Sequence, residues 1–134
     1  MKTLKIVIVL LLLYAAVVVL FESLLGYFQP EAGSTMIIST YEQDGTAHQR
    51  VVARLELDGQ LFVAVNHWPR AWYRRMLRNP EVRISFDDTA GVFRAVRLAR
   101  AEYDRVNTAH GLPFVFRLLT GFPPRHLFRL DPAV

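Results

Sequence analysis

The segment from Arg70 to Val82, R-A-W-Y-R-R-M-L-R-N-P-E-V, specifies a helix, its end and a following strand. Four apolar side chains form two pairs spaced four residues apart: Trp72 with Met76, and Tyr73 with Leu77. Arginines recur at the same spacing on another face, which is the pattern of an amphipathic helix. Asn79 and Pro80 end this helix, because proline disfavours α geometry at the residue before it and has no backbone N–H. Residues 81–86 then alternate between polar and apolar side chains and predict a strand.

An uninterrupted run of 16 apolar residues, Ile6 to Phe21, lies near the N-terminus. At a rise of ~1.5 Å per residue this run is slightly short of a ~30 Å hydrocarbon core. The 22 residues from Leu4 to Leu25 are long enough, and they predict one membrane-spanning helix. In that helix Lys5 and Glu22 lie near the two interfaces, and Tyr27 and Phe28 serve as interfacial aromatics.

The apolar run divides the chain into an anchor at residues 1–28, a linker at 29–35 and a folded domain at 36–134. A secretory signal peptide has a similar basic start and apolar centre, so cleavage after the run is the alternative to an uncleaved anchor. Both lysines precede the run, and all 14 arginines lie at or beyond Arg50. The positive-inside rule therefore predicts a cytoplasmic N-terminus and a domain on the exported, periplasmic or extracellular, side.

About 100 residues follow the anchor, enough for one small domain. Two Asp-Gly pairs, at 44–45 and 58–59, separate apolar alternations and predict hairpins. The expected strands are 36–42, 47–57, 61–65, 81–86, 92–103 and 126–130, and the expected helices cover 70–78 and 112–120. This order, β-β-β-α-β-β-α-β, is mainly β with helices and suits a small closed antiparallel barrel, which leaves no exposed sheet edge.

The helix-and-strand segment closely resembles the signature W-Y-x-x-L-x-x-N-P-x-V of the deazaflavin (F420)-dependent nitroreductase and quinone reductase family, small proteins of the FMN-binding split-barrel type. A second match comes at the end of the chain, at His110-Gly111 and at Phe128 to Pro132. The resemblance covers roughly residues 36 to 132. It implies a small split β-barrel that binds FMN or F420 and often pairs with a second barrel.

The resemblance also implies a set of cofactor-binding residues. Arg50, in the second strand, resembles a residue of the family's basic stretch, which contacts the cofactor phosphate. Trp72 and Tyr73 are expected to border the ring, and Arg74 to add positive potential. Tryptophans at helical spacing are also common in protein cores, and an arginine stripe is also common on a solvated or lipid-facing helix surface.

Two segments depart from the family pattern. The family's G-R-K-x-G loop is replaced by residues 41–46, Y-E-Q-D-G-T, in which Glu42 and Asp44 stand where a polyanionic cofactor expects cations. The small glycine-containing loop of the relatives is replaced by residues 66–70, N-H-W-P-R, where Trp68 and Pro69 are bulky. These changes favour the alternative that the barrel binds no cofactor.

Several other chemistries have no support in the sequence. The chain has no cysteine, and its four histidines are scattered without metal-ligand spacing, so no metal site is expected. The serines lack a nucleophile-elbow context, and no catalytic residue can be assigned. A net charge of +4 on an exported domain gives no reason to expect nucleic-acid binding.

Two functions are therefore open. One is a membrane-anchored flavin- or deazaflavin-dependent oxidoreductase of the nitroreductase or quinone-reductase type, in which the cofactor carries the redox chemistry. The other is a cofactor-free split barrel that serves as an accessory or docking subunit of a larger membrane complex.

Overall fold

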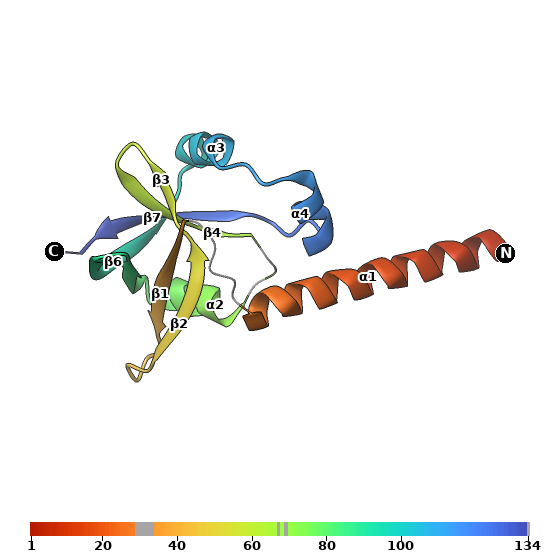
Figure 1. Ribbon diagram of the computed structural model, residues 1–134, viewed down its shortest axis with the longest axis horizontal. Helices are drawn as coiled ribbons and strands as arrows, with labels where there is room; N and C mark the ends of the chain where they lie inside the picture. The colour runs from red at the N-terminus through yellow and green to blue at the C-terminus, as the bar shows by residue number, and fades with distance from the viewer. Residues whose placement is uncertain (29–33, 67, 69, 134) are drawn as a thin grey trace.

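The computed structural model describes residues 1–28, 34–66, 68 and 70–133, and for residues 26–28 the backbone only. The helices are α1 (Lys2–Phe28), α2 (Ala71–Arg78), α3 (Arg100–Ala109) and α4 (Phe114–Thr120). The strands are β1 (Thr35–Tyr41), β2 (Ala47–Ala53), β3 (Leu55–Leu57), β4 (Gln60–Val65), β5 (Glu81–Phe86), β6 (Thr89–Arg97) and β7 (His126–Pro132). Figure 1 shows α1 projecting away from a curled sheet, with α3 and α4 on one side.

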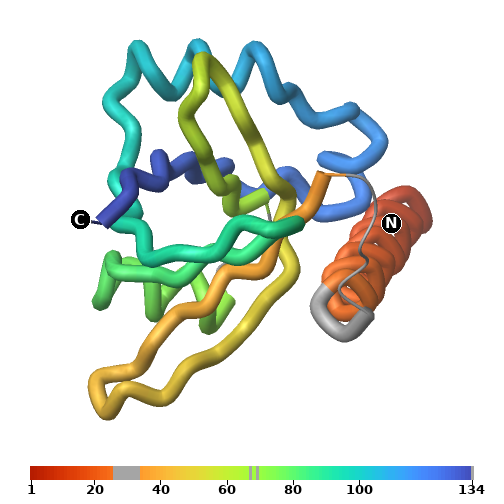
Figure 2. Tube along the Cα trace, turned by 60° about the vertical axis from the view of Figure 1, so that its left-hand side comes forward, coloured from red at the N-terminus to blue at the C-terminus, as the bar shows by residue number. Residues whose placement is uncertain are grey.

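The seven strands form one antiparallel sheet in the order β2-β1-β5-β6-β7-β4-β3. The first and last strands in this order are neighbours in the chain, because only Arg54 separates β2 from β3. The sheet must therefore curl until its two edges meet at this residue, as the trace in Figure 2 shows. The predicted split barrel preceded by an apolar helix is confirmed as a curled half-barrel whose edges are joined at one end. The predicted strand 47–57 is thus two strands, broken where the chain passes from one edge to the other.

The predicted turn chemistry explains the hairpins. Asp58 and Gly59 form the two-residue loop between β3 and β4, and both have positive φ, of 53° and 75°. A two-residue hairpin of this kind needs positive φ at both positions, which Asp-Gly supplies at little steric cost. In the β1–β2 loop the Asp44 side chain accepts a hydrogen bond of 2.9 Å from the backbone N–H of Thr46.

Helix α2 plugs the barrel with three side chains of its first six positions. Trp72, Tyr73 and Met76 are buried in one core cluster with residues of β1, β4, β5 and β7. Leu77, predicted to share this apolar face, is 51% exposed, so that part of the prediction is wrong. At ~100° per residue, Leu77 points about 40° beyond Tyr73 and leaves the buried stripe.

Helix α3 was not predicted, because residues 92–103 were assigned to one strand. Strand β6 ends at Arg97, and residues 100–103 begin the helix instead. The helical signal is short: Tyr103 and Val106 are three residues apart, and both pack on a second core cluster with Phe62 and Leu127. The alternating pattern of β6 runs into this segment without a proline or glycine to mark the boundary.

Helix α1 contains a stretch, Lys2–Leu25, that is long and apolar enough to cross a membrane. A signal sequence meets the same requirement. One face of α1 contacts the rest of the molecule through four side chains at helical spacing, described below: Tyr14, Val18, Phe21 and Glu22. The expected interfacial aromatics Tyr27 and Phe28 lie at the end of α1, but their side chains fall outside the described residues, as do residues 29–33 of the expected linker.

The contrast between Met76 and Leu77 gives a stability test. Met76→Ala should lower the free energy of unfolding by about 2–5 kcal/mol, because it leaves a cavity in the core. Leu77→Ala, one residue away on the same helix, should change it by less than about 0.5 kcal/mol. Urea unfolding of the detergent-solubilised chain, followed by tryptophan fluorescence, measures both. Similar losses for the two variants would contradict the burial assigned to α2.

Candidate functional site

The four sequence-predicted cofactor residues lie in three different environments. Trp72 and Tyr73 are only 3% and 6% exposed and belong to the core. The Tyr73 hydroxyl accepts a 3.1 Å hydrogen bond from Arg97, and its ring stacks on His126 at 5.1 Å. Arg74 is exposed on the outer face of α2. Trp72, Tyr73 and Arg74 line none of the three clefts described below, whereas Arg50 lines one.

Arg50 belongs to a polar junction between α1 and the barrel. Arg70, directly before α2, donates hydrogen bonds from Nη2 to the carboxylate of Glu22 at 2.6 Å and to its backbone carbonyl at 2.7 Å. Arg50 donates to the carbonyl of Leu25 at 3.3 Å. Burial, and then the neighbouring positive charge of Arg70, lowers the pKa of Arg50 from its ordinary value. These two guanidiniums therefore hold the end of the apolar helix.

A cleft of about 460 Å³ adjoins this junction. Its lining combines apolar side chains of α1 with the polar junction: Val18, Val19, Glu22, Ser23, Arg50, Trp68 and Arg70. Carboxylate Oε1 of Glu22 is buried there and has no hydrogen-bond partner among the described residues. Of the predicted loop 66–70, His67 and Pro69 lie outside the described residues.

The acidic loop at residues 41–46 faces arginines of α2. Tyr41, Glu42 and Asp44 line a cleft of about 350 Å³ together with Arg75 and Arg78. Arg75 also donates a 2.9 Å hydrogen bond to the hydroxyl of Thr40. The two acids predicted to repel an anionic cofactor thus lie beside basic side chains, which offset their charge locally.

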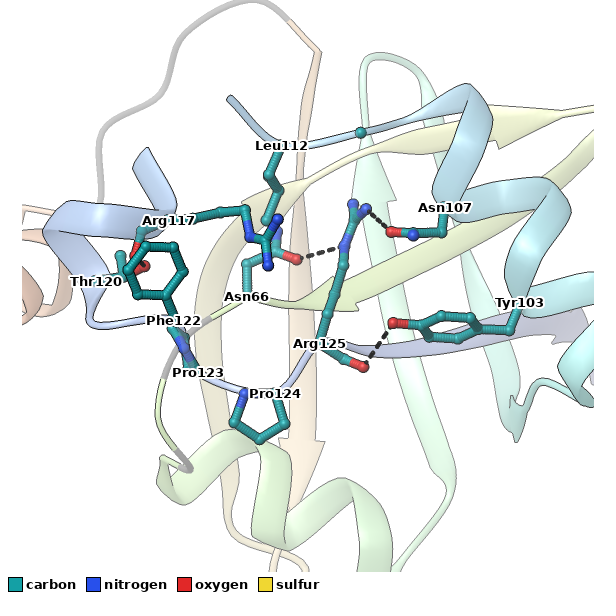
Figure 3. Close-up of a pocket in the computed structure, with 11 residues that line it drawn as sticks. Asn66, Tyr103, Asn107, Leu112, Arg117, Thr120, Phe122, Pro123, Pro124 and Arg125 are labelled. Atoms are coloured by element: carbon teal, nitrogen blue, oxygen red, sulfur yellow. Dashed lines mark hydrogen bonds between the residues drawn. The ribbon is translucent and has the colours of Figure 1, made fainter. Parts of the chain in front are cut away.

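A polar pocket of about 460 Å³ lies between the barrel and the two C-terminal helices (Figure 3). Arg125, just before β7, donates from Nε to Asn66 at 2.8 Å and from Nη1 to Asn107 at 2.6 Å. The hydroxyl of Tyr103 donates to the carbonyl of Arg125 at 3.1 Å. Two side chains, Asn66 directly after β4 and Asn107 of α3, thus fix this guanidinium in the pocket, and its burial lowers the pKa of Arg125.

A second guanidinium reaches the same pocket from α4. Arg117 extends from that helix towards Arg125 in Figure 3, and its guanidinium lies 5.6 Å from the ring centre of Phe122. Within the described part of the chain, neither Arg117 nor Arg125 forms an ion pair with a carboxylate, whereas Arg129 pairs with Glu102 and Asp131. Two guanidiniums held by neutral partners favour an anion, because a guanidinium binds phosphate or carboxylate bidentately.

Sequence reasoning missed this pocket, although one signal for it is present. Residues 111–124 contain a single charged side chain, Arg117, in an otherwise apolar segment. Asn66, Asn107 and Arg125 carry no comparable local signal. Among the residues that the structure describes, no three His, Asp or Glu side chains gather as metal ligands would.

Comparison with known proteins shows the fold. No protein-family model matches the chain, and no curated protein sequence matches it. HutZ, described as the heme storage protein from Vibrio cholerae, is 21% identical with a TM-score of 0.58, over 75% of this chain and 82% of HutZ. An F420-H2 dependent reductase, FDR-A, is 15% identical with a TM-score of 0.55, over 75% of this chain and 100% of that one.

Two further solved structures share the fold. One, described as a domain-swapped dimer, is 14% identical with a TM-score of 0.62, over 75% of this chain and 82% of that chain. The other is Atu2129 from Agrobacterium tumefaciens, of unknown function, 17% identical over 75% of this chain with a TM-score of 0.60. This chain spans about half, 49%, of the length of Atu2129. At these identities the likeness shows a shared fold, the split-barrel-like sheet described above.

The junction at Glu22 gives a test of how α1 is held. Glu22→Gln or Arg70→Met leaves one unpaired charge at a largely buried site. Each is expected to weaken the docking of α1 on the barrel by about 3–5 kcal/mol. The double variant removes both charges and should have a smaller effect. Because the chain has no cysteine, spin labels at Leu10→Cys and Asp88→Cys report the distance between helix and barrel by pulsed electron resonance. The single variants should broaden that distance distribution. Arg78→Gln, an exposed arginine of α2, is the control, and unchanged distributions in both single variants would contradict the junction.

Proposed function

We propose that this chain is a membrane-tethered split-barrel oxidoreductase that binds a planar, anionic cofactor of the flavin or deazaflavin class, FMN or F420. The observation that carries the proposal is the pair of guanidiniums of Arg117 and Arg125 in one pocket without a carboxylate partner among the described residues. The pocket also offers apolar walls from Leu112, Phe122 and Pro124. Its volume of about 460 Å³ lies within the ordinary range for ligand sites.

The residues of the pocket fit the anionic part of such a cofactor. Arg125, oriented by Asn66 and Asn107, and Arg117 hold a phosphate or carboxylate group, and the ring of Phe122 offers an apolar face for a heterocycle. The cofactor, when bound, supplies the hydride or electrons for reduction of a hydrophobic acceptor such as a quinone or nitro compound. The protein contributes binding and orientation.

The resemblance-based residue set remains a second proposal for the same cofactor. In that arrangement Arg50 holds the phosphate, Trp72 and Tyr73 border the ring, and Arg74 adds positive potential. Arg50 is engaged at the α1 junction and the two aromatic side chains pack in the core, so we favour the pocket of Arg117 and Arg125. Substitutions at Arg50 and at the pocket arginines separate the two arrangements.

Titration of the detergent-solubilised chain with FMN and with F420, followed by absorbance and fluorescence, tests the proposal. Arg117→Gln and Arg125→Gln should each weaken binding on the order of 10- to 100-fold, the loss expected for one charged hydrogen-bonding partner. Arg83→Gln on the outer face of β5 is the matched control and should leave affinity unchanged. A loss confined to Arg50→Gln would favour the resemblance-based site. Dissociation constants above about 1 mM for both cofactors, only about 4 kcal/mol of binding, would contradict cofactor binding altogether.

One observation favours a second function, an accessory or docking subunit without cofactor. Arg50, the predicted phosphate ligand, and the neighbouring Arg70 form hydrogen bonds that hold α1. Failure of both titrations, together with stoichiometric co-purification of the untagged chain with another membrane protein, would support this function. Recovery of the chain alone, as a monomer or a homodimer like the domain-swapped match, would oppose it.

We also propose that α1 is an uncleaved span with a cytoplasmic N-terminus and that the barrel domain is exported. The predicted linker 29–35 then joins α1 to the barrel at Thr35, the first residue of β1. A single cysteine at Thr89, exposed at the start of β6, should react with a membrane-impermeant maleimide in intact cells. A cysteine at Lys2 should react only after the cells are lysed. The reverse pattern would overturn this topology, and a purified mature chain lacking α1 would show that the helix is a cleaved signal.

A further inference from the structure

Exposed apolar side chains of the barrel domain gather on one short segment. Residues 111–124 contain Phe114 and Val115, 66% and 64% exposed, and also the exposed Leu118 and Phe122. Trp68, also exposed, donates its indole N–H to the carbonyl of Thr120 at 2.9 Å and so joins the same surface. We call this surface, formed by Trp68, Phe114, Val115 and Leu118, the α4 patch; Phe122 beside it also lines the pocket of Arg117 and Arg125. An apolar surface of this density usually marks an interaction site.

The α4 patch lies directly beside the apolar helix α1. The Tyr14 hydroxyl donates a 2.8 Å hydrogen bond to the carbonyl of Leu118, and the rings of Phe21 and Phe116 meet edge to face at 6.0 Å. Val18 approaches Gly121 so closely that a Cβ there would meet its methyl group at 3.0 Å. Figure 1 shows α4 next to α1, and Figure 2 shows the same neighbours from another side.

These contacts place α4 along the apolar part of α1 and not beyond its end. Tyr14 and Phe21 are seven positions apart, so the contact extends over about 10 Å of helix axis. Both positions lie inside the stretch Lys2–Leu25 that is apolar enough to span a bilayer. If α1 spans, a helix docked at this level lies in the hydrocarbon of the leaflet nearest the barrel.

We infer that the α4 patch is a second membrane element, which enters the acyl-chain region of one leaflet beside α1 without crossing the bilayer. The inference rests on α1 as a membrane span and is independent of which cofactor the barrel binds. The occupant of the exposed face is lipid, because the face is continuous with that of α1, whose own spanning stretch has none of its residues buried.

The charged side chain and the C-terminal polar groups of α4 suit a membrane-embedded helix. Its one charged side chain, Arg117, lines the pocket and extends towards Arg125 (Figure 3). At its C-terminal end, Gly121 donates to the carbonyl of Leu118 at 3.2 Å and Phe122 donates to that of Arg117 at 2.9 Å. The Thr120 hydroxyl donates to Phe116 at 2.9 Å. Satisfied backbone and hydroxyl groups at this end of the helix suit surroundings without water.

Collision accessibility of a spin label in the full-length chain tests the inference. The chain is reconstituted into vesicles of phosphatidylcholine and phosphatidylglycerol, with one cysteine at a time carrying a nitroxide. Molecular oxygen, enriched in hydrocarbon, and a water-soluble nickel chelate then serve as the two relaxing agents. Val115→Cys should favour oxygen as Leu10→Cys in α1 does, whereas Thr89→Cys on β6 should favour nickel.

A second label at Phe114→Cys guards against a local disturbance at residue 115, and it should also favour oxygen. Leu77→Cys, an exposed apolar position near the C-terminal end of α2, is the matched control and should resemble Thr89→Cys. Nickel-favoured collisions at both 114 and 115, with residue 10 still oxygen-favoured, would overturn the inference while leaving the membrane tether intact. Nickel-favoured collisions at residue 10 as well would overturn both.

Discussion

The arrangement of this molecule depends on one ion pair, between Glu22 and Arg70. Glu22 lies at the end of a long apolar helix, where an unpaired carboxylate would be costly in a weakly polar environment. Its partner directly precedes α2, the helix whose Trp72, Tyr73 and Met76 plug the barrel. The pair therefore fixes α1 relative to the core of the barrel. With α1 fixed in this way, its Tyr14 and Phe21 meet α4, and α4 in turn closes one side of the pocket around Arg125.

The arginines fall into groups with different consequences for function. Some, such as Arg54 and Arg129, pair with carboxylates of the barrel and are electrostatically satisfied. Arg50 and Arg70 hold the end of α1. Arg117 and Arg125 meet only neutral groups within the described residues, which leaves their charge available to a ligand. A positive composition alone does not distinguish these groups, and the last one supports the binding site that we favour.

Local patterns predicted the elements that local chemistry determines. The two Asp-Gly turns and the Asn-Pro stop gave correct hairpins and a correct helix end, because φ preferences act within a few residues. The break at Arg54 depends on where the two sheet edges meet, and helix α3 depends on which segment covers Phe62. Local patterns therefore predicted neither. The pocket escaped prediction for the same reason, because Asn66, Asn107 and Arg125 are distant in sequence and meet only through the fold.

The joint at Arg54 has a mechanical consequence for the barrel. Two virtual Cα–Cα bonds of 3.8 Å keep Ala53 and Leu55 within about 7 Å of each other, so the two sheet edges cannot separate there. The Arg54 side chain lies over the ring of Phe86, 4.6 Å from its centre, and pairs with Asp87 at 3.1 Å. These contacts connect the β2–β3 joint to the β5–β6 turn. The barrel is therefore held closed at Arg54 and is less constrained at its other end. Any widening that admits a bulky ligand must occur away from Arg54.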